Sequence, residues 1–201
     1  MTTEKKRNDI YTRVFSFLIA HNIQTVPVDV KLLCMHLDVE LVPLSEIENG
    51  TGLSMWDVFE IWGNEDGTAI VDFSENRKIF KIAYNDRTPR RSMFTIAEEI
   101  GHIILGHLED PSFSVFSQTY EDETYLKYEE EARIVAGLLI CPPNFYYKNE
   151  QHLNEVNLSD LCHISKACAH VRIDVLNKYR DEINMHPLYN KLPEVSSTNS
   201  I

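Results

Sequence analysis

Five consecutive residues, Glu98-Glu99-Ile100-Gly101-His102, have the spacing of a metal-binding helix. In the H-E-x-x-H pattern, two histidines four residues apart leave one helix face and bind one metal ion. The glutamate after the first histidine then acts as a general base. Here Glu99 and His102 occupy the base and second-ligand positions, and Glu98 stands where the first histidine would be. A glutamate oxygen ligates zinc at about 2.0–2.2 Å. The string therefore predicts a metal site that contains Glu98 and His102, with Glu99 as the catalytic base.

The sequence around this string predicts a largely buried helix over residues 89–106. Pro89 suits a first helical turn, and apolar residues recur at helical spacing along the segment. An E-E-x-x-H string also occurs by chance on solvated acidic helices, but the apolar frame argues against that interpretation. Gly101 costs about 1 kcal/mol inside a helix, so it indicates the close approach of another element.

A second predicted helix, residues 123–140, supplies the third candidate ligand, Glu129. A carboxylate from a second helix is the usual third ligand in this type of zinc site. Small residues on the same helix would allow it to approach the first one closely: Ala132, Ala136 and Gly137. We therefore expect Glu129 to face His102. The neighbouring Glu130 and Glu131 are expected to be solvated, with Glu131 as a fallback ligand if the helix is rotated.

These motifs together resemble the ImmA/IrrE family of cytoplasmic metallopeptidases over roughly residues 28 to 145. The resemblance rests on Ile82-Ala83-Tyr84-Asn85, residues 90–97, the E-E-I-G-H string, Leu105-Gly106-His107, and the E-x-x-A helix at 129 to 142. It implies a gluzincin-like fold and a zinc endopeptidase in which His102 and Glu129 ligate the metal and Glu99 is the base. Family members typically cut a helix-turn-helix repressor, often one encoded beside them in a phage or mobile element.

Glu98 departs from the family pattern and opens two alternatives. A Glu/His/Glu site is harder and more anionic than a His/His/Glu site, so Mn²⁺ or Fe²⁺ could replace Zn²⁺. The leading hypothesis is a regulatory metal-dependent endopeptidase with Glu98, His102 and Glu129 as ligands. The rival is a catalytically silent relative that binds a repressor or antitoxin-like partner without cutting it.

The remaining pattern predicts an α+β fold in which a small antiparallel sheet precedes a helical core. Strands are expected over residues 38–43, 53–62, 68–73 and 78–84, and helices over 4–22, 28–37, 89–106, 123–140 and 158–179. Ser165 could cap a helix inside the last segment and split it in two. Trp56 and Trp62 are expected in the sheet core or in a cleft wall. Four segments follow: an N-terminal helix (1–27), a metallopeptidase-like domain (28–145), a helical segment packed on it (146–185), and a disordered tail (186–201).

The composition of the chain disfavours some classes of binding partner. The 201 residues carry a net charge of -12, which disfavours generic binding to a phosphate backbone. Residues 158–173 have the rhythm of a helix-turn-helix but contain only Lys166 and Arg172 as cations, so we interpret them as packing or partner docking, with no direct nucleic-acid contact. No apolar run approaches the roughly 20 residues of a membrane span. Four scattered cysteines without a C-x-x-C pair predict reduced thiols and a cytoplasmic location.

The other histidines are expected to have secondary roles. His107 follows His102 by five residues and is interpreted as a surface or supporting histidine. His163 and His170 lie near Cys162 and Cys168, but core cysteines and surface histidines are commoner than a second metal site.

Overall fold

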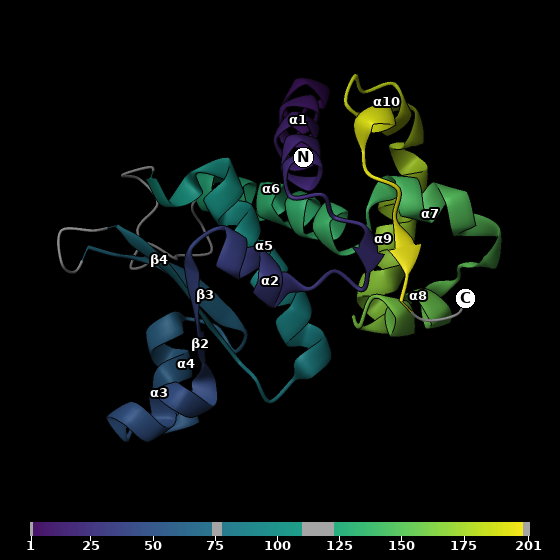
Figure 1. The fold of residues 1–201 in the computed structure, drawn as a ribbon. Helices are drawn as coiled ribbons and strands as arrows, with labels where there is room; N and C mark the ends of the chain where they lie inside the picture. The colour runs from purple at the N-terminus through teal and green to yellow at the C-terminus, as the bar shows by residue number, and fades with distance from the viewer. Residues whose placement is uncertain (1, 74–77, 110–122, 199–201) are drawn as a thin grey trace.

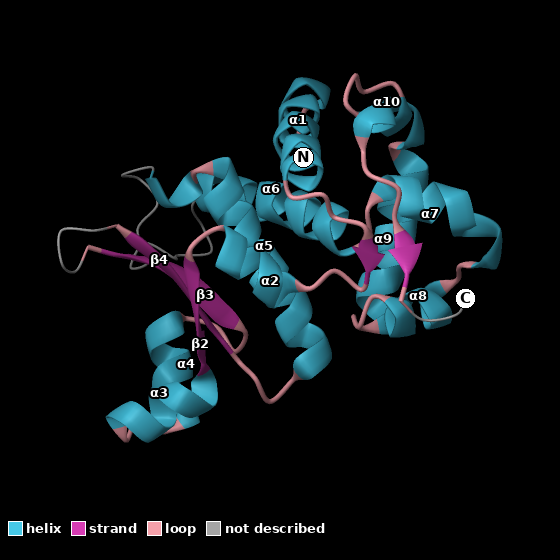
Figure 2. Ribbon diagram, viewed as in Figure 1, coloured by secondary structure: helices cyan, strands magenta, loops and turns pink. Residues whose placement is uncertain are grey.

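The computed structural model describes residues 2–73, 78–109 and 123–198, and it is an α+β protein with mostly helices around a small sheet. Its α-helices are α1 (Glu4–Ala20), α2 (Val30–His36), α3 (Leu44–Thr51), α4 (Met55–Trp62), α5 (Pro89–Leu105), α6 (Glu123–Ile140), α7 (Pro143–Asn149), α8 (Glu155–Leu161), α9 (Lys166–Lys178) and α10 (Arg180–Asn184). Short 3-10 helices are η2 (His107–Glu109), η4 (Glu150–His152) and η5 (Tyr189–Lys191). The strands are β1 (Thr25–Val26), β2 (Val39–Pro43), β3 (Gly67–Asp72), β4 (Ile79–Tyr84) and β5 (Ser196–Ser197). Figures 1 and 2 show β2, β3 and β4 together at one side of the molecule, with α7 to α10 at the other.

The main sheet is mixed, and the prediction of an antiparallel sheet is wrong for one of its two pairings. Its order is β2-β4-β3, with β4 in the centre. β3 and β4 pair antiparallel, whereas β2 runs parallel to β4, with Val39 opposite Phe80. The reason is topological: α3 and α4 lie between β2 and β3, so β2 reaches the sheet through a helical crossover.

The segment predicted as a strand over residues 53–62 is instead helix α4. Ser54 and Asp57 form a capping box at its start, and Gly63 ends it in the left-handed conformation at φ 73°. Trp62 is buried in a small second core against Ala83 of β4, while Trp56 is 68% exposed. The aromatic residues suggested a strand, but the capping residues determine the local structure.

The sheet separates this second core from the main one. Ala83 belongs to the core under α3 and α4, whereas its neighbour Ile82 faces the main core with Ile100 of α5. Successive side chains of a strand point to opposite faces, so α5 packs on the face opposite α4. Helices α1, α5 and α6 complete the main core, and Figure 1 shows α1 lying beside α6.

Helices α5 and α6 are in close contact, as Gly101 predicted. A Cβ atom at Gly101 would lie 2.8 Å from the Ala132 backbone oxygen. The prediction for Gly137 is wrong, because this glycine faces α9: a Cβ there would lie 2.9 Å from an Arg172 nitrogen. The two glycines thus allow contacts on opposite sides of α6.

After the C-terminal helices α7 to α10, the chain returns to the N-terminal part, where β5 pairs in parallel with β1. The prediction of a disordered tail is corrected for residues 186–198, which contain η5 and β5; residues 199–201 lie outside the described part. Val195 is buried, and the Ser196 amide donates to the Gln24 carbonyl at 2.9 Å. The Pro- and Ser-rich composition of this segment gives no indication of these long-range contacts.

Among the described helices, none is long and apolar enough to cross a membrane.

Candidate metal centre

Helix α5 presents the three residues of the predicted motif. Pro89 begins the helix and Gly106 ends it at φ 77°, a left-handed conformation that favours glycine. The helix buries its apolar face in the main core. Its fixed register places Glu98 and His102 one turn apart on the same face, where both line one cleft with Glu99.

Helix α6 brings Glu129 to this face. The Glu129 Oε1 atom lies 3.3 Å from Nε2 of His102, whose side chain is only 2% exposed. The structure therefore brings together the two residues that the sequence expected to meet. The close approach at Gly101 makes this distance attainable, since a larger residue there would push α6 away.

The contact shifts both groups toward their charged forms. Burial alone lowers the pKa of His102, but the hydrogen bond to Glu129 and the surrounding carboxylates outweigh it and raise this pKa. Burial likewise opposes ionisation of Glu129, yet His102 and Arg133 hold its pKa below the ordinary value. Each of the two groups therefore favours the charged form of the other.

Glu98 is bound by Arg133, which also contacts Glu129. The Arg133 Nε donates to Glu98 at 2.9 Å, and its Nη2 donates to Glu129 at 3.0 Å. Burial nevertheless raises the pKa of Glu98 to about 7, with Glu129 and Glu99 adding to the shift and Arg133 opposing it. Sequence reasoning missed Arg133, although its i,i+4 spacing from Glu129 signals a shared helix face.

Glu99 lies at the wall that β3 forms. Burial raises the pKa of its carboxyl above the ordinary value, and Glu129 adds to this, while His102 and a hydrogen bond with the Ala69 backbone oppose it. A carboxyl whose pKa moves toward neutrality has the property that a general base requires.

The cleft around these groups has a volume of about 180 Å³. Its walls come from the β3 region and from α5 and α6: Asn64, Asp66, Gly67, Thr68, Ala69, Thr95, Glu98, Glu99, His102, Tyr125, Leu126, Glu129 and Arg133. It therefore gathers the predicted base and the three predicted ligands in one concave site. Among the described residues, however, no group of three His, Cys, Asp or Glu side chains is arranged to hold a metal ion.

His107 and Glu131 lie behind His102, away from the cleft lining. The His107 Nδ1 is 3.0 Å from Nδ1 of His102, and its Nε2 is 3.2 Å from Glu131 Oε2. Both are almost fully buried, at 4% and 0% exposure. Of the two interpretations of His107, the structure favours a supporting position over a surface one. The expectation that Glu131 is solvated is wrong, and its fallback role as a ligand finds no support in these contacts.

The remaining candidates lie elsewhere. Glu130 accepts a hydrogen bond from the Thr2 amide at 3.0 Å. His170 is exposed on α9 and pairs with Glu155 at 2.6 Å. His163 is exposed, while Cys162 is buried. In the described part of the chain, these residues form no group of metal ligands.

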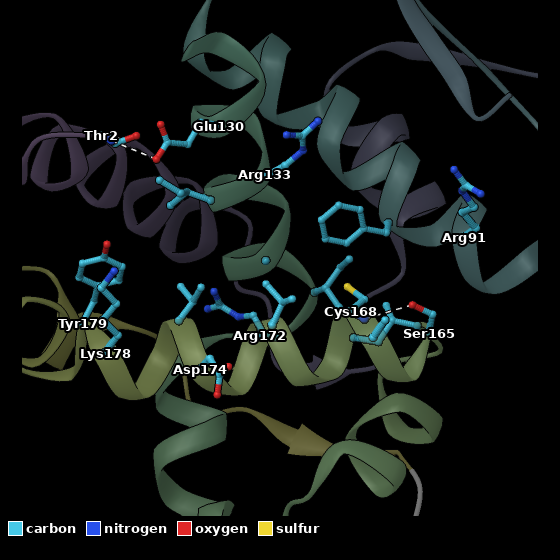
Figure 3. A pocket seen from close by; sticks show the side chains of 18 of the residues that line it. Thr2, Arg91, Glu130, Arg133, Ser165, Cys168, Arg172, Asp174, Lys178 and Tyr179 are labelled. Atoms are coloured by element: carbon cyan, nitrogen blue, oxygen red, sulfur yellow. Dashed lines mark hydrogen bonds between the residues drawn. The ribbon is translucent and has the colours of Figure 1, made fainter. Parts of the chain in front are cut away.

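A larger apolar groove of about 780 Å³ adjoins the cleft. Helices α5, α6 and α9 form its walls, with apolar side chains that include Phe94, Ile134 and Val171. Figure 3 shows α9 along one side and Arg133 reaching from α6 toward α5 at the opposite side. Arg133 lines both the groove and the cleft, so the two are neighbours.

The chain matches a known protein family. The IrrE N-terminal-like domain of peptidase family M78 matches residues 57–174, more than half of the chain. The match runs from α4 through α5 and α6 and into α9. No curated protein matches the chain at a significant level.

Proposed function

Because the chain belongs to peptidase family M78, which has an IrrE N-terminal-like domain, we propose that it is a metal-dependent endopeptidase. The metal would be held between α5 and α6, in a gluzincin-like arrangement of the two helices. The observation that best supports this proposal is the 3.3 Å distance between His102 Nε2 and Glu129 Oε1. The family establishes a metallopeptidase-like domain, and the activity of this chain is our inference.

That distance fits a zinc ion. Two ligands of a tetrahedral zinc, each about 2.0–2.1 Å from the ion, lie about 3.3 Å from each other. His102 and Glu129 thus already have the separation of one edge of a tetrahedral site. A nitrogen and a carboxylate oxygen are also suitable donors for this borderline ion.

Glu98 is the proposed third ligand, and it would have to exchange Arg133 for the metal. Its carboxylate shares the cleft with His102 and Glu129. The Arg133 side chain is 58% exposed and can turn toward solvent, while the Glu98 side chain, 18% exposed, would exchange one cation for another. A set of two carboxylates and one imidazole accepts Zn²⁺, and it accepts Mn²⁺ or Fe²⁺ more readily than a two-histidine set does.

Glu99 is the proposed catalytic base. Burial and the nearby Glu129 raise the pKa of its carboxyl, so that it can accept a proton from water and return it to the leaving amine. A bound metal ion would polarise the scissile carbonyl and lower the pKa of water. The β3 wall, including Ala69, would flank the substrate.

A peptidase acts on proteins, and we propose a helix-turn-helix repressor as the substrate. The groove beside the cleft supports a protein partner, because its apolar lining suits an apolar segment of a polypeptide. Six cations and two carboxylates line this groove in a chain of 19 cationic and 31 acidic residues. An amphipathic segment with acidic residues is therefore the best match. We place this activity in the cytoplasm, since all four cysteines are free thiols.

One observation favours a second candidate, a silent relative that binds a partner without cutting it. Arg133 donates to both Glu98 and Glu129, so a guanidinium already balances the two carboxylates that a metal would join. In this alternative, the ion pair replaces the metal and the groove retains its binding role.

Metal content and cleavage distinguish the two candidates. Purified protein would be stripped with a chelator, reloaded with Zn²⁺ or Mn²⁺, and incubated with each repressor encoded beside its gene. Bound metal and new peptide termini, detected by mass spectrometry and absent with Glu99→Gln, would support the endopeptidase. Partner binding without metal or cleavage would support the silent relative.

A further inference from the structure

A line of four polar side chains leads from the candidate metal centre to the N-terminal helix. His102 Nδ1 faces His107 Nδ1 at 3.0 Å, His107 Nε2 faces Glu131 Oε2 at 3.2 Å, and the Lys6 ammonium lies 3.0 Å from the same oxygen. The three inner side chains are 2%, 4% and 0% exposed. The line joins α5, η2, α6 and α1.

The position of each proton follows from the two ends of this line. Lys6 can only donate, so the Glu131 oxygen beside it accepts. The second partner of that oxygen, His107 Nε2, must then carry a hydrogen. A neutral imidazole has one N–H, which leaves His107 Nδ1 as an acceptor, and His102 Nδ1 must donate to it.

The proton on His102 Nδ1 determines which ring nitrogen can bind a metal ion in the cleft. Because Nδ1 of His102 keeps its proton against His107, Nε2 is the ring atom that can exchange its proton for a metal ion, and this atom faces Glu129 Oε1 at 3.3 Å. When Nε2 loses its proton, the line therefore leaves His102 as the tautomer that can bind a metal ion through Nε2.

We propose that His107, Glu131 and Lys6 are positioning residues that fix His102 as an Nε2 metal ligand. This inference rests on the proposed metal centre. Ligating histidines commonly donate their other ring N–H to a fixed acceptor, and losing that acceptor typically lowers metal affinity 10–100-fold. Here the acceptor is a second histidine, which is held in turn by a buried carboxylate.

Packing alone does not account for these residues. Glu131 is fully buried, and its second oxygen, Oε1, has no hydrogen-bond partner in the described part of the chain. A buried carboxylate with an unsatisfied oxygen destabilises the fold, whereas an apolar side chain would fill the same space without this cost. The ring of His107 also stacks on Tyr128, with centroids 4.1 Å apart, and this contact fixes its plane.

Two substitutions of His107 separate positioning from packing. His107→Gln retains an acceptor for His102 and a donor for Glu131, whereas His107→Phe retains the ring and its stacking on Tyr128 but removes both hydrogen bonds. We expect Zn²⁺ affinity, measured by competition with a chromophoric chelator, to fall at least tenfold in His107→Phe. His107→Gln should stay within about threefold of wild type. Equal affinities in the two variants would overturn the proposal.

A metal-free measurement tests the line independently of the proposed function. In nitrogen-15 NMR spectra of chelator-treated wild type, His107 should carry its proton on Nε2 and accept at Nδ1. A proton on His107 Nδ1 would overturn the proposal even if zinc binds. If the expected tautomer is found and zinc does not bind, the metal centre fails while the proton arrangement stands.

Lys6 offers a milder variant at the far end of the line. Its side chain is 36% exposed, so Lys6→Met should preserve the fold, with Lys5→Met as a control from the exposed neighbouring position. We expect Lys6→Met to weaken Zn²⁺ binding two- to fivefold, because Glu131 loses its fixed donor, and Lys5→Met to leave it unchanged. Equal effects of the two substitutions would remove Lys6 from the line.

Discussion

Arg133 and Glu98 join helices α6 and α5 at the candidate metal centre, with the guanidinium Nε 2.9 Å from the carboxylate. The same guanidinium contacts Glu129 at 3.0 Å. A fixed cation therefore neutralises two of the proposed ligands. A metal ion entering this site competes with Arg133 for the same oxygens.

Removing this competitor should strengthen metal binding. Arg133→Met frees both carboxylates and removes a positive charge a few ångströms from the metal. At an effective dielectric constant near 20, such a charge costs more than about 1.4 kcal/mol. We expect Zn²⁺ affinity to rise roughly tenfold or more in isothermal titration.

Arg87→Met is the matched control for this substitution. Arg87 is similarly exposed, at 50% against 58%, and pairs with Glu48 away from the cleft. Its removal should leave Zn²⁺ affinity unchanged. A lower affinity in Arg133→Met would mean that the arginine helps to assemble the site.

The helices that form the centre were predictable because their sequence signals are local. Pro89 and the apolar spacing define α5, and the small residues Gly101 and Ala132 indicate the contact with α6. Facing positions on two such helices bring Glu129 to His102. Ser165 likewise caps α9 by accepting from the Cys168 amide, as predicted.

Long-range relationships were less accessible from the sequence. The parallel pairing of β2 with β4 and the contact of β5 with β1 depend on residues far apart in the chain. The sequence alone does not decide whether His107 is a surface or a supporting histidine, because its burial depends on Glu131 and Tyr128, which α6 supplies. The ion pair of Arg133 with Glu98 also depends on how α6 packs against α5, whereas its i,i+4 contact with Glu129 lies within one helix.

Glu99→Gln should abolish cleavage without removing the metal. Glutamine has nearly the same shape but cannot accept the proton from water, and a lost general base typically costs 10²- to 10⁴-fold in rate. Metal content by elemental analysis and the circular dichroism spectrum should match wild type. Equal cleavage rates would show that Glu99 has another role.

Glu98 should make the metal-free protein less stable as the pH rises. Its pKa is raised from 4.5 to about 7 in the fold, so the folded state holds a proton that the unfolded chain releases. The contribution of Glu98 to the free energy of unfolding is therefore most favourable below about pH 4.5. It declines as the pH rises, until the pH passes about 7. The loss amounts to roughly 3–4 kcal/mol at most, for a shift of about 2.5 pKa units at 1.36 kcal/mol per unit.

Denaturant unfolding with a chelator present, at pH values from 5 to 8, measures this effect. The difference between Glu98→Gln and wild type should grow in favour of the variant as the pH rises. Glu60→Gln, which alters an exposed carboxylate on α4, should follow the wild-type curve. Parallel curves for all three proteins would mean that Glu98 does not titrate in this range.

The apolar groove should contribute to partner binding. Val171, 58% exposed on α9, lines the groove, and Val156, 50% exposed on α8, lies outside its lining. A carboxylate in the groove loses the apolar contact and repels an acidic partner. Val171→Glu should therefore raise, at least tenfold, the Kd for an intact repressor that the wild-type protein cleaves, whereas Val156→Glu should not. Both Kd values would be measured in a Glu99→Gln background, in which the repressor stays intact. Similar Kd values for the two variants would exclude the groove from recognition.

Glu98→His rebuilds the two-histidine motif and tests the register of the site. The new imidazole would stand one turn before His102 on the same helix face. Neutral nitrogen suits zinc, and the substitution also removes the carboxylate that Arg133 binds. Zn²⁺ affinity should rise, and the preference for Zn²⁺ over Mn²⁺ should widen, since imidazole favours zinc more than carboxylate does. The metal-free variant should also be more stable at neutral pH, because one carboxylate leaves a crowded acidic site. Parallel titrations of Zn²⁺ and Mn²⁺ into both proteins measure these changes. Unchanged affinity for both metals would mean that residue 98 does not point at the metal, and that His102 and Glu129 act with a different third group.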